Sequence, residues 1–191
     1  MKRIVLLAAL AIAAPAQANW TLNNDRSALS FVSTKAINVA EVHRITDLSG
    51  SIASDGQVDV AIGLSSVDTG IELRDDRMRD MLFETEQFGM ASVSAKVDPE
   101  IFGKLGPGDS RQIIVEAVLS LHGVSRPLQI EFIVARSGES RLIATSARPV
   151  VVNATDFGLG AGVEALREIA GLPSISLAVP VSFVLTFDEA G

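Results

Sequence analysis

Histidine and cysteine, the residues that most often bind metals or carry nucleophilic and proton-transfer chemistry, are scarce in this chain. It contains two histidines, no cysteine and no tyrosine. His43 and His122 are too far apart in sequence to form a local metal motif. Ser120 and Ser125 flank His122 without the glycine context of a nucleophile elbow. We therefore expect no catalytic residue, no metal and no cofactor, and His122 is expected to hydrogen-bond within its own turn.

Charged residues concentrate between positions 74 and 80, where the sequence reads RDDRMRD. On a helix Asp75 would precede Arg79 by one turn, a spacing that favours an ion pair worth about a few tenths of a kcal/mol. One interpretation is a solvated helical face. The other places an arginine at the mouth of a binding site, where Arg74, Arg77 or Arg79 could contact a ligand head group. The spacing and closing glutamate of a calcium-binding EF-hand are absent.

The elements that would position these residues are mostly strands. Apolar and polar residues alternate with a period of two in the segments 58–64, 93–97 and 113–121, and β-branched residues are common in 142–152 and 175–187. Gly, Asp, Asn and Pro separate these runs. The pattern predicts an all-β, single antiparallel sheet, closed as a barrel or folded as a sandwich.

Two segments depart from this alternation and predict short helices. Residues 73–88 carry apolar side chains at spacings of three and four. Residues 163–170 have helical periodicity and are followed by Gly171 and Pro173, which are typical stop signals. Both segments lie between strands, so they could form lids at the ends of a barrel or simply complete its core.

The first eighteen residues predict a secretory signal peptide. Lys2 and Arg3 precede an apolar run of 11 residues, 4–14, and Ala16-Gln17-Ala18 has the small-x-small form of a cleavage site. The run is shorter than the roughly 20 residues that span a bilayer. We expect cleavage after Ala18 and a periplasmic protein; an uncleaved membrane anchor is the alternative.

The expected mature domain is 19–191, which is the length of one domain. Loss of Lys2 and Arg3 changes the net charge from −7 to −9. Such an acidic chain has no basic surface for nucleic acid, and anionic membranes should repel it. Without cysteine, its stability must come from burial and strand pairing.

One predicted hairpin, LSLHGVSRPLQIEF at 119–132, has particularly specific turn chemistry. Leu119 and Leu121 share a face before the turn, as do the apolar residues 128, 130, 132 and 134 after it. Gly123 permits backbone angles that other residues avoid, and Pro127, which lacks a donor, is expected beside the turn.

This hairpin resembles the L-T-L-H-G-V-T-K-P signature of the YceI-like family of lipocalin-like, polyisoprenoid-binding periplasmic proteins. Four further segments match the family in order: WTLNNDRSALSF from Trp20, VHRITDLSGSI at 42–52, RDDRMRDMLFETEQF from Arg74, and Asp156-Phe157-Gly158. Together they cover nearly all of the chain after residue 19.

The resemblance implies a barrel of about eight strands with one or two short helices, and an isoprenoid ligand such as a polyprenyl lipid or a quinone tail. Many alternating positions carry Val, Ala or Ile, which leave room inside such a barrel. We expect the cavity to be lined by strand residues and aromatics: Phe31, Val58, Val60, Ile62, Leu64, Phe83, Phe88, Leu119, Leu121, Phe132 and Phe157.

These observations predict a soluble, non-catalytic carrier that shields an isoprenoid lipid, without stable membrane insertion; a homodimer stays open. One alternative is an enzyme or chaperone of quinone or isoprenoid metabolism that uses the 74–80 cluster and His122. Another is a stress-response barrel whose interior is fully packed.

Overall fold

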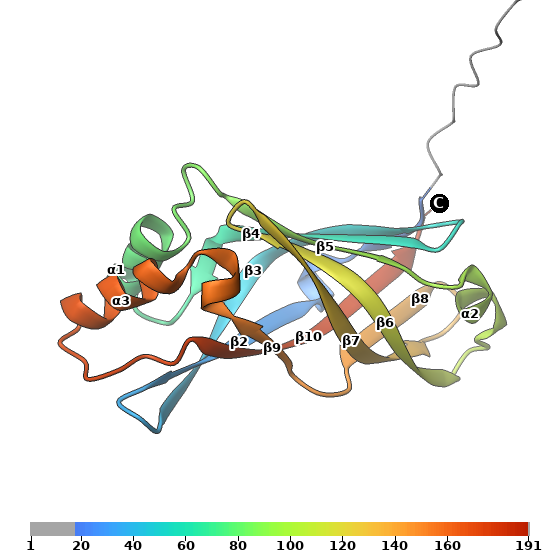
Figure 1. The fold of residues 1–191 in the computed structure, drawn as a ribbon. Helices are drawn as coiled ribbons and strands as arrows, with labels where there is room; N and C mark the ends of the chain where they lie inside the picture. Colours follow the sequence, from blue (N-terminus) through green and yellow to red (C-terminus); the bar gives the residue numbers. More distant parts are fainter. Residues whose placement is uncertain (1–17, 191) are drawn as a thin grey trace, which may run out of the picture.

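A computed structural model describes residues 18–190, and its main feature is a closed antiparallel β-barrel of eight strands (Figure 1). The barrel closes because the last strand pairs on one side with β2 and on the other with β8. This confirms the predicted barrel and removes the sandwich alternative. The eight strands are β2 (Ala28–Lys35), β3 (Val39–Ala53), β4 (Gln57–Asp68), β5 (Met90–Lys96), β6 (Ser110–Leu121), β7 (Val124–Arg136), β8 (Arg141–Ser146) and β10 (Ala178–Glu189).

Two short strands extend this barrel. β1 (Ala18–Leu22) pairs with β10 and β3, and β9 (Val150–Asn153) pairs with β10. The run 142–152, predicted as one β-rich segment, is therefore two strands, because residues 147–149, which include a proline, separate β8 from β9. The predicted signal peptide lies outside the described residues except for Ala18, the first residue of β1.

The β6–β7 hairpin forms around Gly123 as predicted, and its turn consists of two residues. His122 and Gly123 both have positive φ, 51° and 74°, as in the type I′ turns that match the twist of paired strands. Leu121 pairs with Val124 across the turn. Pro127 lies inside β7, not beside the turn, but it pairs only with β6, since β8 joins β7 from Phe132 onward. The missing N–H donor of Pro127 therefore costs no ladder hydrogen bond on the side of β7 where β8 has not yet joined.

The first predicted helix is shorter than expected. α1 (Glu72–Arg77) continues directly into the π-helical turn η2 (Met78–Leu82), and the prediction of helix up to residue 88 is wrong beyond Leu82. Phe83 donates its amide to the carbonyl of Met78, five residues back, and Glu84 leaves the helix with a φ of 49°. This exit turns the chain inward at Phe83, which is buried.

The second predicted helix, α3 (Gly160–Ile169), begins three residues earlier than expected and ends before Gly171, which has a φ of 63°. It packs closely on η2: a Cβ at Gly162 would lie 2.5 Å from the carbonyl oxygen of Met81. A third helix, α2 (Pro99–Lys104), was not predicted. Asp98 caps it by accepting a hydrogen bond from the Glu100 amide, and Pro99 occupies its first position.

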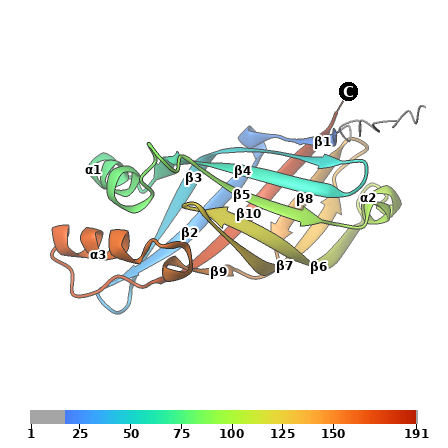
Figure 2. The same ribbon diagram turned by 45° about the horizontal axis from the view of Figure 1, so that its top comes forward.

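Figures 1 and 2 show that α1 and α3 lie together at one end of the barrel and that α2 lies at the opposite end. Two 3₁₀ turns complete the chain, η1 (Asn24–Arg26) and η3 (Ala154–Phe157), the latter leading into α3. Among residues 18–190 we find no helix with the length and hydropathy needed to cross a membrane.

Candidate functional site

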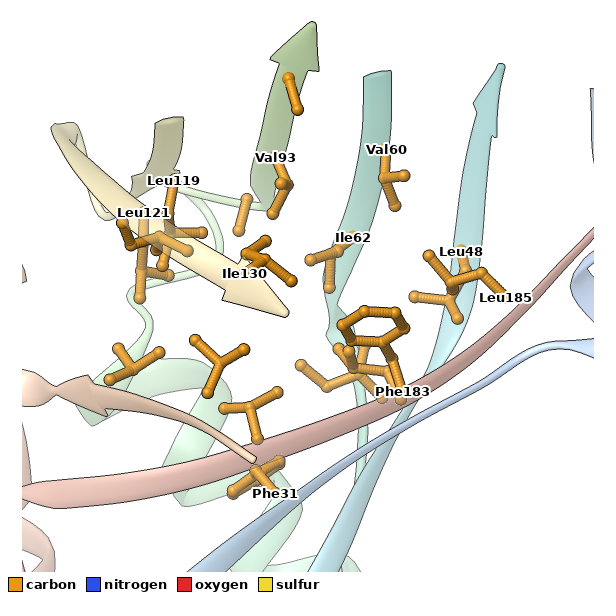
Figure 3. Close-up of a pocket in the computed structure, with 18 of the residues that line it drawn as sticks. Phe31, Leu48, Val60, Ile62, Val93, Leu119, Leu121, Ile130, Phe183 and Leu185 are labelled. Atoms are coloured by element: carbon orange, nitrogen blue, oxygen red, sulfur yellow. The ribbon is translucent and has the colours of Figure 1, made fainter. Parts of the chain in front are cut away.

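The barrel encloses an apolar cavity of about 260 Å³. A buried water needs only about 10 to 15 Å³ on this scale, so the interior can accommodate an elongated organic ligand. Every residue that lines the cavity is Ala, Val, Leu, Ile or Phe. Figure 3 shows their side chains converging from strands on opposite sides of the barrel.

The alternation of the strands explains why these side chains meet. Successive side chains point to opposite faces of a strand, so one apolar set per strand enters the barrel. Nine of the eleven predicted residues are among the lining residues: Phe31, Val58, Val60, Ile62, Leu64, Phe83, Leu119, Leu121 and Phe132.

The other two predicted residues, Phe88 and Phe157, lie outside the cavity lining. The Phe88 ring lies tilted at 52° against the ring of His122 in the β6–β7 turn, with 4.3 Å between centroids. Phe157 is 3% exposed and packs in a smaller core cluster with Ala154 and Leu159. Both residues lie outside the strands, in a loop and in a 3₁₀ turn, where alternation in the sequence does not predict which way a side chain points.

Many lining residues were missed by the sequence prediction. On β10 they are Val179, Val181, Phe183, Leu185 and Phe187, whose alternation was visible but was not assigned a face. On β3 they are Ile45, Leu48 and Ile52. The register shift between Ile45 and Asp47 moves the inward face from odd to even positions, which hides the periodicity.

The cavity extends towards both ends of the barrel, and helical segments contribute to both ends of the lining. Phe102 of α2 lines it at one end, and Leu82, Phe83, Leu159 and Val163 line it near η2 and α3. The helical segments therefore contribute apolar side chains at both ends of the cavity, which agrees with the core-closure interpretation; a lid role stays a prediction.

A network of charged residues occupies the α1 end, next to the β2–β3 hairpin. Arg74 donates to Glu41 at 2.7 Å, to the Thr69 hydroxyl at 2.8 Å and to the Thr69 carbonyl at 2.7 Å. Lys35 approaches the same Glu41 carboxylate at 2.9 Å. The hydrogen bond from Lys35, together with the charge of Arg74, lowers the pKa of Glu41. The polar atoms of Arg74 are thus engaged by protein groups.

The other two head-group candidates differ in their surroundings. Arg79 donates to the Ser65 carbonyl at 2.9 Å and pairs with Asp76. Arg77 is half-buried, and its side chain makes no hydrogen bond or ion pair within residues 18–190. The predicted Asp75–Arg79 pair does not form. Asp75 is buried and accepts hydrogen bonds from the Thr69 amide and hydroxyl, at 2.9 and 2.5 Å.

His43 is a buried polar residue on a strand that contributes to the apolar lining. It is 3% exposed, it follows the same face of β3 as Ile45, and it pairs across the ladder with Phe31. Its ring lies edge-on to the Phe31 ring, with centroids 5.3 Å apart. Burial, followed by the charge of Arg74, lowers the pKa of His43. Ile45 and Phe31 line the cavity, so His43 stands at its boundary.

The comparison with protein families decides the identity of this barrel. The model of the YceI-like domain matches residues 20–187, nearly the whole described chain. The chain belongs to the YceI-like family. A solved YceI-like relative, described as a polyisoprenoid binding domain from Saccharophagus degradans implicated in plant cell wall breakdown, is 38% identical. The match covers 91% of this chain and 100% of that one, with a TM-score of 0.89.

More distant structures share the fold of this YceI-like chain. BcnA from Burkholderia cenocepacia is 18% identical with a TM-score of 0.66, over 86% of this chain and 98% of its own. A YceI protein from Campylobacter jejuni is 15% identical with a TM-score of 0.56, over 78% and 85% of the two chains. No curated protein matches the sequence.

His122, the histidine of the family signature, links two loops of this YceI-like barrel. Its Nε2 lies 2.7 Å from a Glu84 carboxylate oxygen, so its partner is outside the turn where we expected it. The Ser120 and Ser125 hydroxyls hydrogen-bond each other at 2.7 Å. Within residues 18–190 we find no group of three or more His, Asp or Glu side chains arranged to hold a metal ion.

Proposed function

We propose that this YceI-like protein is a carrier that holds the tail of an isoprenoid lipid inside its barrel. The observation that carries the proposal is the cavity of about 260 Å³ whose lining residues are all apolar. The ligand class comes from the 38% identical relative, a polyisoprenoid binding domain. A fully packed structural barrel would not retain such a volume, because protein interiors normally exclude voids larger than a water molecule.

The energetics favour exchange between membranes over permanent storage. Burial of each CH₂ contributes about 0.8 kcal/mol relative to water, so a few isoprene units hold the lipid firmly against loss to solvent. Relative to a bilayer the gain is close to zero, because the tail already lies in hydrocarbon. A carrier of this kind can therefore release its ligand to a membrane.

We propose a periplasmic location, with residues 1–18 removed as a signal peptide and 19–191 as the mature domain. The basic start, the apolar run and the Ala16-Gln17-Ala18 site support export. The absence of cysteine from the sequence is compatible with an oxidising compartment.

We propose a non-catalytic role. The cavity lining offers no proton donor, base or nucleophile. The His122 ring is engaged by Glu84, and the polar atoms of Arg74 are engaged by Glu41 and Thr69; neither residue is among those that line the cavity. The enzyme alternative would need a reacting group beside the ligand.

Native mass spectrometry of protein purified from the periplasm tests the proposal. We expect a co-purified hydrophobic mass that leaves on delipidation and is replaced by added geranylgeraniol. A chain that carries no lipid and binds none after delipidation would refute the carrier role. Conversion of the bound mass into another product during incubation would instead support the enzyme alternative.

A further inference from the structure

The loop of the β2–β3 hairpin, residues 36–38, carries an isoleucine that is both exposed and strained. Ile37 is 87% exposed, more than any other large apolar side chain within residues 18–190. Its φ is 75°, a conformation that β-branched residues rarely adopt and that Gly or Asn adopts readily. Isoleucine is therefore unfavourable here for solvation and for the backbone, and no packing within the described chain compensates for it.

The loop is held in a defined position. The Ala36 amide donates to the Ser174 carbonyl at 3.0 Å, and the Ile37 amide donates to the Ser174 hydroxyl at 3.3 Å. The Ser176 amide donates to the Thr34 carbonyl at 2.8 Å. The segment that follows α3 thus fixes the hairpin, and the Ile37 side chain is presented to the surroundings of the protein.

Ile37 belongs to a group of exposed apolar residues at one end of the barrel. Figures 1 and 2 show the β2–β3 hairpin projecting at the end where α1 and α3 lie. Half of the exposed large apolar side chains of residues 18–190 lie on this hairpin, at the start of α1, or between the end of α3 and β10: Ile37, Val39, Ile71, Leu73, Ile169 and Leu177. None lies on α2, at the opposite end. We call these six residues the apolar tip.

The apolar tip is close to one end of the cavity. Leu82 and Phe83 line the cavity where η2 continues from α1, and Val163 lines it from α3. A carrier of the kind proposed above exchanges its ligand with a membrane. Contact between this end and a bilayer would bring the apolar interior near the hydrocarbon, so this step of the argument rests on the carrier function.

The layout of the apolar tip suits a bilayer better than a protein partner. A stable protein interface buries about 800 Å² on each partner over a continuous surface. Here the apolar side chains stand on separate projections, and the ion pairs of Glu41 with Lys35 and Arg74 link the hairpin to α1. A bilayer interface accepts separate apolar side chains, and its head groups solvate the polar groups between them.

The charges near the apolar tip favour a zwitterionic surface. α1 and η2 interleave three arginines with four acidic residues, and α3 carries one arginine between two glutamates. Anionic lipids are recognised by clusters of four or more basic residues, and these elements contain no such cluster. The whole chain is acidic, with a net charge of −7, so an anionic surface would repel it.

We propose that the apolar tip docks reversibly on a zwitterionic lipid bilayer, with the Ile37 side chain inserted below the head groups. The inference goes beyond the carrier function, because docking is measurable on delipidated protein. Ile37 then has a partner that offsets its exposure, and the strained loop presents it to that partner.

Co-sedimentation of delipidated protein with phosphatidylcholine vesicles measures docking. Ile37→Asn should weaken vesicle binding by about tenfold, because transfer of a large aliphatic side chain out of water is worth at least this factor. Its Tm should be unchanged or higher, since asparagine tolerates a positive φ and is better solvated. A fall in Tm would show that Ile37 packs within the fold, and unchanged vesicle binding would show that it does not insert; either result overturns the proposal.

Ile114, an exposed isoleucine on the outer wall of β6, is the matched control. Ile114→Asn removes the same side chain and should leave vesicle binding unchanged, whereas Leu73→Gln on α1 should weaken it. Equal losses in Ile114→Asn and Ile37→Asn would mean that the protein adheres through any apolar side chain, and the assignment to the apolar tip would be wrong.

A fluorescent label reports the position of the hairpin directly. The sequence has no cysteine, so one introduced thiol is labelled uniquely. The dye NBD on Ile37→Cys should emit at shorter wavelength with phosphatidylcholine vesicles and be quenched by brominated acyl chains. The same dye on Ile114→Cys should show neither effect. Equal quenching at the two positions, or quenching at neither, would refute the docked orientation.

Vesicles that contain phosphatidylglycerol test the choice of surface. At low ionic strength we expect weaker binding to them than to pure phosphatidylcholine. A preference for phosphatidylglycerol would show a contact driven by arginines and would overturn the proposal. So would a protein that sediments with neither vesicle but forms a dimer that Ile37→Asn disrupts. These failures leave the carrier function untouched, because native mass spectrometry of the bound lipid tests it separately.

Discussion

Substitution of Val60 by phenylalanine tests whether the barrel interior is room for a ligand or an imperfectly packed core. Val60 lies on β4 and points into the cavity (Figure 3). Its natural control is Val67 on the same strand, which is 2% exposed and does not line the cavity. Both changes replace an isopropyl group by a benzyl group, so they differ only in what surrounds the side chain.

The expected magnitudes follow from the two environments. Overpacking of a dense core costs about 1 to 3 kcal/mol, so Val67→Phe should lower Tm by roughly 2 to 12 °C at about 2 to 4 °C per kcal/mol for a domain of this size. Val60→Phe can extend its ring into the cavity of about 260 Å³ and should change Tm by less than about 2 °C. Differential scanning calorimetry of delipidated protein measures both.

Ligand binding should show the opposite order. A phenyl ring at position 60 occupies space that the tail would fill, and displacing roughly one five-carbon isoprene unit into water forfeits about 4 kcal/mol. This corresponds to more than a hundredfold in Kd for geranylgeraniol. Val67→Phe should bind nearly as the parent protein does. Strong destabilisation by Val60→Phe with unchanged lipid affinity would mean that this face packs against protein, and the cavity argument would fail.

Three further predictions concern the turn, the buried histidine and the N-terminus. Gly123→Val should lower the urea midpoint more than His122→Ala, because a β-branched residue is strained at a φ of 74° and its Cβ would lie 3.0 Å from the Phe88 ring; the reverse order would contradict this. The pKa of His43 is lower in the folded protein than its unfolded value of about 6.5, so the stability that this shift contributes is present above that unfolded value and is lost as pH falls through the folded pKa. Tm should therefore fall between pH 7 and pH 5. The fall should be smaller in His43→Gln, which has no imidazole to titrate. Exported protein should begin after Ala18 by N-terminal sequencing, and an intact Met1 or retention in membranes would refute export.

The strands were predictable because their determinants are local, whereas closure as a barrel was predicted only by the resemblance to the YceI-like family, since the alternation also allowed a sandwich. Alternation at 58–64 identified the inward face of β4 correctly, since Val58, Val60, Ile62 and Leu64 all line the cavity. The β6–β7 turn was predictable for the same reason, as His122 and Gly123 have a spacing and residue types that suit a two-residue hairpin.

Features that depend on distant contacts were not predictable in this way. The bulge on β3 inverts the inward parity after Ile45, and nothing in the local sequence marks it. The first helix stops at Leu82 without a glycine or proline, because Phe83 turns into the core. α2 was missed although Asp98 and Pro99 form a recognisable start, since the helix is only 6 residues long.

The head-group candidates show that a charged residue in a single sequence does not reveal which partners its side chain has in the fold. Arg74 is conspicuous in the sequence, but in the fold it donates a hydrogen bond to Glu41, 33 residues earlier. Lys35 contacts the same Glu41 carboxylate. His43 has no metal-ligand spacing and stands in an ordinary strand pattern, so it drew no ligand hypothesis. Only the fold shows that its ring is buried beside Phe31 and that its Nδ1 has no hydrogen-bond partner within residues 18–190.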